Sequence, residues 1–277
     1  MELLPRVAVL PRQGTLLISA DLHGNGGDFR ALLKAFEGAR ALDPGTCWVL
    51  LGDAIHGPDE AAREREPELY DFPDESWPIV KELDQLRARL PGNVIYVLGN
   101  PDLAQLGGPR TCKFHPDEAA HLESTLTDLE REQLLAFLSG SHLAVVAPCG
   151  ALLTHGSPDD RLRSLESLGR IELPPRPEQI YEWDVLTSLL TSYGQPAEVT
   201  ERLLATVRRS VPGIIMVVHG HDRDPAGWFV EGGNQICPVL FGAPRGQKRY
   251  LRLDLGASYR TVADLRDGVE IVKLFPT

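Results

Sequence analysis

Six polar side chains in this 277-residue sequence are of the kinds that bind divalent metal ions, and each lies within three residues of the end of an apolar run. Together they offer carboxylate, imidazole and amide groups, a mixture that suits ions of intermediate hardness such as Mn, Fe or Zn. No cysteine is among them, so a structural zinc site is a poor match. Each motif alone is ordinary turn chemistry, but five similar endings in one chain predict a shared metal site. The predicted ligands are Asp21, His23, Asp53, Asn100, His155 and His221.

The five apolar runs before these residues are short and lack polar alternation, which is typical of strands buried on both faces. In open α/β sheets, ligands bind beyond the carboxyl ends of such strands. We therefore expect the six side chains to converge at one sheet edge. The predicted strands span residues 15–20, 47–51, 93–98, 151–154 and 213–218.

The rest of the chain predicts the elements that position these strands. Apolar residues at helical spacing predict helices over 28–38 and 79–90. Residues 57–78 form a long, acidic, proline-containing insertion, which either shapes substrate access or is a solvated loop. A polar, helical block at about 159–210 is expected to form a cap-like insertion beside the site. Alternating short strands over 228–274 predict a second sheet.

In order and spacing, the motifs resemble the calcineurin-like metallophosphoesterase superfamily, and they lean toward its serine/threonine phosphoprotein phosphatase branch. The resemblance implies an α/β fold of two packed, mostly mixed β-sheets flanked by helices, a four-layer sandwich. Because the motifs span most of the chain, we expect residues 1–277 to form a single metallophosphoesterase-like domain. The motifs are Asp21-x-His23-Gly-Asn, Gly52-Asp53, Gly99-Asn100, His155-Gly and Gly220-His221.

The resemblance also implies a role for each ligand. It places Asp53 between two divalent ions, and a hydroxide that bridges these ions attacks phosphorus without a covalent phosphoenzyme. The ions are expected to be Mn²⁺, with Fe, Zn or Mg as alternatives. His219 competes with His221 as a ligand, but the Gly-His frame of the superfamily selects His221. The remaining ligands divide into two sets, one for each ion: Asp21 with His23, and Asn100 with His155 and His221.

Two motifs depart from the phosphatase branch. In its motif Gly-Asp-x-x-Asp-Arg-Gly, the second Asp orients a catalytic histidine and the Arg binds phosphate, whereas this chain has His56 and Gly57 there. The catalytic histidine itself is replaced by Pro101, which cannot donate a proton. We therefore predict His56 and Asp102, from the two altered motifs, as catalytic residues.

Positive charge for the substrate must then come from other residues. Arg110, Lys113 and Arg223 are the candidate substrate-binding residues, since cations beside the ligands hold phosphoryl oxygens; the alternative is ordinary surface charge. The predicted activity is hydrolysis of phosphate monoesters, on a phosphoprotein or a small phosphate ester. A nucleotide or dinucleoside polyphosphate hydrolase, or another phosphodiesterase, is an alternative. Pro101 favours a further one, a catalytically weakened metal-binding homologue.

The composition limits the classes of partner that we expect. With a net charge of −11, the chain lacks the basic surface that is typical of nucleic-acid-binding proteins. Neither a secretory signal nor an apolar stretch of about 18 residues is visible, so no membrane partner is expected. The four cysteines are far apart and predict free thiols. These features predict a soluble cytoplasmic protein.

Overall fold

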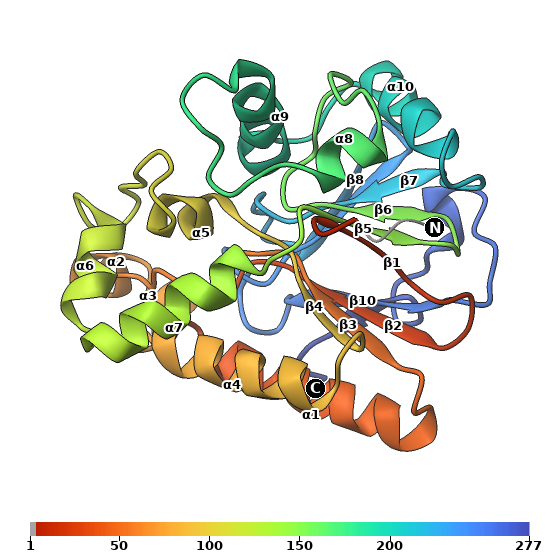
Figure 1. Cartoon of the computed structure of the whole chain (residues 1–277). Coiled ribbons are helices and arrows are strands. Elements are labelled where there is room, and N and C mark those ends of the chain that lie inside the picture. Colours follow the sequence, from red (N-terminus) through yellow and green to blue (C-terminus); the bar gives the residue numbers. More distant parts are fainter. Residues whose placement is uncertain (1–3, 277) are drawn as a thin grey trace.

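Two β-sheets are packed face to face, with helices on both outer faces (Figure 1). The computed structural model describes residues 4–276. One sheet has five strands in the order β11-β10-β2-β3-β4, and the other has six in the order β1-β5-β6-β7-β9-β8. Both mix parallel and antiparallel pairs. This arrangement confirms the predicted fold class.

Alternation along each strand explains why the ligand strands have apolar residues throughout. In β2, Leu16 and Ile18 contribute to the core between the sheets, whereas Leu17 packs against the outer helices. Helices α1, α4 and α7 cover this sheet (Figure 1). The strands are β2 (Thr15–Ser19), β3 (Cys47–Leu50), β4 (Val94–Tyr96), β10 (Arg249–Asp254) and β11 (Ile271–Lys273). The helices are α1 (Gly26–Leu42), α4 (Ser76–Arg89) and α7 (Asp128–Ser139).

The six-stranded sheet follows the same rule. Leu153 lies in the core between the sheets, and Leu152 packs against the helices of the opposite face. Its strands are β1 (Val7–Val9), β5 (Ala144–Ala147), β6 (Ala151–Leu153), β7 (Met216–Val218), β8 (Trp228–Glu231) and β9 (Gln235–Pro238). The block predicted at 159–210 supplies the outer helices α8 (Leu165–Gly169), α9 (Ile180–Thr191) and α10 (Ala197–Arg208) (Figure 1).

The helix that follows β2 begins where the sequence predicts it, within a residue or two. The side chain of Asn25 accepts a hydrogen bond from the backbone N–H of Asp28 and caps α1. Phe29, Leu32 and Phe36 form the buried stripe. The capped turn ends β2 abruptly, which leaves the residues between strand and helix free to form the site.

Two topological predictions were wrong. The ligand strands do not share one sheet, because β2, β3 and β4 lie in one and β6 and β7 in the other. The tail does not form a separate second sheet either. Instead, β10 pairs with β2 and β9 pairs with β7, so the tail strands cover an edge of both sheets. Pairing of exposed strand edges is a tertiary event that alternation along the chain does not encode.

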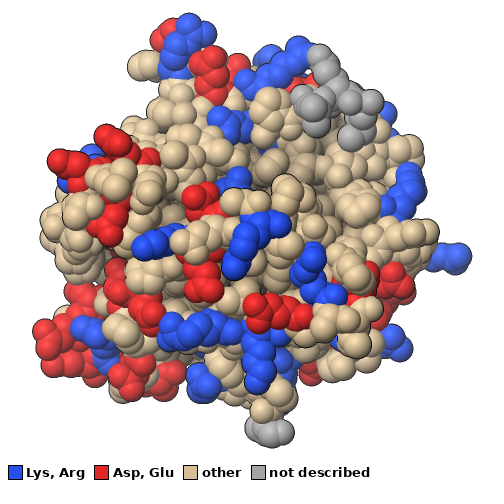
Figure 2. Space-filling view, turned by 60° about the horizontal axis from the view of Figure 1, so that its bottom comes forward, with Lys and Arg blue, Asp and Glu red and all other residues tan. Residues whose placement is uncertain are grey.

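The remaining elements are short. Residues 57–78 contain α2 (Glu60–Arg65) and α3 (Pro67–Tyr70), followed later by α5 (Asn100–Gln105), α6 (Glu118–Ser124) and the 3₁₀ helix η1 (Val262–Asp264). Of the described helices, none is long and apolar enough to span a membrane. On the face seen in Figure 2, basic and acidic side chains are interspersed.

Candidate metal centre

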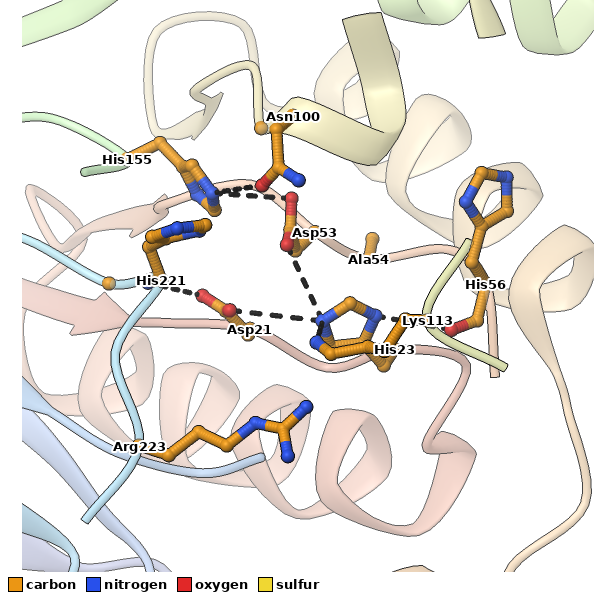
Figure 3. Close-up of polar contacts among 12 residues, drawn as sticks. Asp21, His23, Asp53, Ala54, His56, Asn100, Lys113, His155, His221 and Arg223 are labelled. Carbon is orange, nitrogen blue, oxygen red and sulfur yellow. Dashed lines mark hydrogen bonds and ion pairs between the residues drawn. The ribbon is translucent and has the colours of Figure 1, made fainter. Parts of the chain in front are cut away.

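The six predicted ligands lie together where the carboxyl ends of the two sheets meet (Figure 3). Asp21 and His23 follow β2, and Asp53 follows β3. Asn100 is the first residue of α5, just after β4. From the other sheet, His155 follows β6 and His221 follows β7. All but Asn100 and His221 are buried.

Asp53 lies between two sets of ligands. With Asp21 and His23 it forms one set, and with His155 and His221 another, each with ligand atoms within 4.8 Å of one another. Its Oδ2 lies 3.4 Å from Nε2 of His23, and its Oδ1 lies 3.4 Å from Nε2 of His155. The two oxygens of one carboxylate thus face two different imidazoles, the arrangement that a bridging ligand requires.

The hydrogen bonds of the two histidines assign their tautomers. Nδ1 of His155 lies 2.6 Å from the carbonyl oxygen of Leu51, and Nδ1 of His23 lies 3.1 Å from that of His56. A carbonyl only accepts, so each Nδ1 carries the proton and each Nε2 presents a lone pair to the cluster.

The donor atoms therefore fit a divalent cation. Nε2 of His155 faces Oδ1 of Asn100 at 3.1 Å and Oδ1 of Asp53 at 3.4 Å. Within the described residues, this Asp53 oxygen is buried and has no hydrogen-bond partner. Lone pairs that converge in a buried space repel one another unless a cation lies between them.

The backbone is strained where the ligands are presented. His23, Asp53 and His221 have φ values of 45°, 51° and 68°, in the left-handed region that non-glycine residues rarely adopt. The N–H groups of Leu22 and His23 both donate to the carbonyl oxygen of Asp53, which ties the two turns together. Strain of this kind persists only where the surrounding structure fixes it, and it is concentrated at functional sites.

Gly99 is needed for close approach rather than for its own conformation. A Cβ atom at this position would collide with the carboxylate and backbone of Asp53. The Gly99-Asn100 motif therefore brings the start of α5 directly against the central carboxylate.

Burial shapes the charge state of the cluster. It raises the pKa of Asp53 well above its usual value, and the nearby carboxylates of Asp21 and Asp102 add to this rise. It also lowers the pKa of His221 to about 4 and that of His23 well below its usual value. The imidazoles of His23 and His221 are therefore neutral at pH 7, the form that binds metals, and a bound cation would favour the Asp53 carboxylate.

Asp102 supports the cluster through hydrogen bonds to its backbone. Its Oδ2 accepts hydrogen bonds from the backbone N–H groups of Gly99 and Asp53, at 2.7 and 3.3 Å, and from the hydroxyl of Tyr96 at 2.8 Å. Asp102 is fully buried. The structure thus places it where it fixes the backbone of the central ligand, and its catalytic role stays a prediction.

His56 contributes its carbonyl oxygen, not its ring, to the cluster. Its imidazole points away from Asp53 (Figure 3), and its Nε2 lies 3.0 Å from Oε1 of Gln105. The predicted catalytic role of His56 also stays a prediction, and the ring would have to turn from Gln105 to reach a substrate. His219, the competing histidine, is fully buried, and its Nδ1 faces the carbonyl oxygen of Gly220 at 3.0 Å.

The three candidate substrate-binding residues do not all lie at the cluster. Although Lys113 is exposed as a residue, its ammonium donates to Nε2 of His23 at 2.9 Å, so it must leave this lone pair before a metal ion binds there. Arg223 lies beside the same Phe241 ring as Lys113, and burial, followed by the charge of Arg223, lowers the pKa of Lys113 to about 8. Arg110 is exposed and pairs instead with Asp117 at 3.3 Å.

Sequence reasoning missed an aromatic cluster beside the two cations. Tyr70, Phe114 and Phe241 contact one another with ring centroids 5.1 to 5.9 Å apart. The ring of Phe241 also packs on that of His23 at 4.2 Å. These residues lie in three separate loops or short helices, so no local pattern in the sequence marks them.

The comparisons with known proteins agree with this geometry. The model of the calcineurin-like phosphoesterase family matches residues 14–225, so the chain belongs to that family and is a metallophosphoesterase. A search of curated proteins found no match.

Solved structures show the same fold at low sequence identity. A protein serine/threonine phosphatase from Saccharomyces cerevisiae, with similarity to human phosphatase PP5, has a TM-score of 0.64 and 15% identity, over 90% of this chain and 77% of that one. A cold-active protein-tyrosine phosphatase of a psychrophilic Shewanella species has a TM-score of 0.56 and 16% identity, over 93% of this chain and 82% of that one.

Proposed function

We propose that this metallophosphoesterase hydrolyses phosphate monoesters with two divalent ions, Mn²⁺ first among the candidates. The observation that carries the proposal is the Asp53 carboxylate, which faces two sets of imidazole and carboxylate ligands beside two cationic side chains. Divalent ions in such a site supply a Lewis acid and a water of lowered pKa.

In this proposal the protein residues orient the ions and the substrate. Asp21 and His23 hold one ion, Asp53 is shared, and the imidazole tautomers are fixed by backbone carbonyl groups. Asp102 keeps the Asp53 backbone in its left-handed turn through their hydrogen bond. The other ion is assigned to Asn100, His155 and His221.

The preference for monoesters rests on charge. A terminal phosphate carries up to two negative charges near neutral pH, whereas a diester carries one. Lys113 and Arg223 add two positive charges on one side of the ligand cluster, so they favour the more highly charged group.

The segment after α9 contributes Tyr193, whose ring lies 5.0 Å from that of His221. We propose that it forms part of the cap on the substrate side.

A substrate panel tests the proposal. The purified protein is loaded with Mn²⁺, Fe²⁺, Zn²⁺ or Mg²⁺, its metal content is measured, and four substrates are assayed. These are p-nitrophenyl phosphate, bis(p-nitrophenyl) phosphate, a phosphoserine peptide and a dinucleoside polyphosphate. We expect about two ions per chain and a higher kcat/KM for the monoesters than for the diester.

Other results would favour the alternatives. Preferential cleavage of the dinucleoside polyphosphate would replace the monoesterase assignment with a nucleotide hydrolase. Two bound ions without hydrolysis of any aryl phosphate would show a metal-binding homologue that has lost catalysis, as the proline at position 101 suggests.

A further inference from the structure

We propose that Tyr70, Phe241 and Gly242 hold the guanidinium of Arg223 in position for the phosphoryl group, so that the insertion at 57–78 completes the phosphate site. This inference rests on the proposed function, because it assigns Arg223 to the substrate. Tyr70 is then a positioning residue, which acts through Arg223 rather than by touching the substrate.

Three residues lie against Arg223. Its Nη1 donates a hydrogen bond to the hydroxyl of Tyr70 at 3.0 Å. Its guanidinium carbon lies 4.9 Å from the centre of the Phe241 ring, a cation–π contact. The third contact is with Gly242, where an added Cβ atom would come within 2.8 Å of Cγ of Arg223. Gly242 also has φ +84°, so a side chain there would be strained in addition.

Tyr70 is itself fixed before it holds the arginine. Only 2% of its surface is exposed, and its ring stacks on Phe241 with centroids 5.1 Å apart and an interplanar angle of 26°. Burial raises the pKa of Tyr70, so its hydroxyl remains protonated and neutral near pH 7. A neutral, immobile oxygen can accept from a guanidinium without forming an ion pair that would cancel its charge.

The place of Arg223 in the chain explains why such a support is useful. In the phosphatase branch that the sequence resembles, an arginine follows the bridging aspartate closely, but Gly57 stands at that position here. Arg223 reaches the site from the turn after His221 on the opposite sheet (Figure 3). As a flexible side chain it would lose rotamer freedom on binding a substrate, and prior ordering removes that cost.

Arg223 lies next to the ligand cluster. The Phe241 ring that its guanidinium contacts also packs on the ring of His23, with centroids 4.2 Å apart. Lys113 lies over the same Phe241 ring, with its ammonium 4.5 Å from the ring centre. One aromatic ring therefore contacts both cations, and Tyr70 contacts only the arginine of the two by a hydrogen bond.

Removal of a single oxygen tests the proposal. Tyr70→Phe keeps the stacked ring and deletes only the acceptor of Arg223. In the Mn²⁺-loaded protein we expect KM for p-nitrophenyl phosphate and Kd for inorganic phosphate, by calorimetry, to rise about fivefold to tenfold. This matches a lost hydrogen bond to a charged group, reduced because the effect is indirect. We expect kcat, metal content and Tm to stay close to those of the wild type.

Two further variants serve as references. Tyr259→Phe removes another tyrosine hydroxyl that accepts a backbone hydrogen bond, from Asp254 at the opposite end of the sheet, and should leave phosphate affinity unchanged. Arg223→Met removes both the charge and the hydrogen-bond donors, and should weaken phosphate binding at least as much as Tyr70→Phe. In the double variant the effect of Tyr70→Phe should vanish, since the group that Tyr70 positions is gone.

The outcomes separate the clamp, which is the contact of Tyr70, Phe241 and Gly242 with Arg223, from the proposed function. Unchanged phosphate affinity in Tyr70→Phe, or an effect that persists in the Arg223→Met background, would overturn the clamp. A fall in Tm and metal content without a selective change in phosphate affinity would show a packing role only, and would also overturn it. If the wild type hydrolyses no monoester, yet its phosphate affinity depends on Tyr70, the clamp stands and the function fails.

Discussion

The candidate metal-ligand cluster and the proposed cationic rim of the site are built in different ways. The cluster consists of Asp21, Asp53 and the other predicted ligands, which directly follow buried strands and are tied by backbone hydrogen bonds. The rim consists of Lys113 and Arg223, which reach the site from loops and are supported by aromatic rings.

This difference shows what each part requires. A pair of divalent ions needs several donors at fixed separation, which rigid strand ends provide at the cost of strained turns such as those at His23 and Asp53. A rim that contacts the substrate needs charge but tolerates variation in its source. An arginine at position 223 can therefore supply the charge that is missing at position 57.

The largest expected effect comes from breaking the centre of the cluster. Asp53→Asn removes the carboxylate shared by both ligand sets, so metal content should fall from two ions per chain. Activity should drop by more than about 100-fold, because even residues outside the ligand set cost about 10–100-fold in metal affinity or activity. Elemental analysis and the p-nitrophenyl phosphate assay measure both, with the exposed Asp128→Asn as the matched control. Full metal loading in Asp53→Asn would refute the shared-ligand role.

A smaller effect is expected at the rim. Lys113→Ala should raise KM for phosphomonoesters about 10-fold or more, since hydrogen bonds to charged groups contribute roughly 1.5–3 kcal/mol. Arg110→Ala should change KM less than about twofold, because its exposed pair with Asp117 contributes little. Steady-state kinetics on the two variants measures the contrast. Equal effects would mean that the rim extends to the surface loop and is not confined to the cluster.

His56→Ala separates a chemical from a supporting role. Because its ring contacts Gln105 and points away from Asp53, we expect a loss below about 10-fold that is the same for p-nitrophenyl phosphate and a phosphoserine peptide. General-acid catalysis contributes about 10²–10⁴ and matters most for the poorer leaving group. A selective loss on the peptide would therefore show that His56 donates the proton after all.

The smallest effect on the reaction is expected at the junction between the sheets on which the cluster depends, where the expected change is in stability. His142 bridges to the end of β4 just before Asn100, and its N–H donates to the carbonyl oxygen of Tyr96 at 3.0 Å. Burial, with a smaller contribution from Arg87 and Arg6, lowers its pKa from 6.5 to about 4. Between these values only the unfolded chain binds the proton, so stability present above pH 6.5 is lost as the pH falls toward 4.

That loss should reach about 2–3 kcal/mol, and His142→Asn should remove this part of the pH dependence. Urea unfolding of both proteins at pH 7.5, 6 and 5 measures the difference. Parallel pH profiles would show that His142 is not a source of acid destabilisation.

The structure agrees with the sequence most closely where the pattern is local. The strand before Asp21 and the start of the helix after Asn25 follow from apolar spacing and lie within two residues of prediction, although the helix ends at Leu42, four residues beyond its predicted end. The outer helices at 159–210 were also expected as helices. Side-chain alternation and helix capping act over a few residues, so a single sequence contains them.

The structure departs from the predictions made from the sequence where distant segments of the chain meet. The pairing of β10 with β2 and of β9 with β7 divides the tail between two sheets, and the ring of His56 lies away from the cluster. Neither outcome has a local signal, because each depends on which exposed edge or buried acceptor is available after the rest of the chain has packed.

The sequence by itself determined the kinds of ligand, their order and the strands that end on them. Only the tertiary structure decided that two sheets share the site, that Asp102 supports Asp53, and that Tyr70 contacts Arg223 across more than half the chain. Short-range steric and hydrogen-bond preferences determine the strands and the residues that follow them. The shared site and the contacts of Asp102 and Tyr70 depend on packing between segments that are distant along the chain, and the sequence holds no local signal for such contacts.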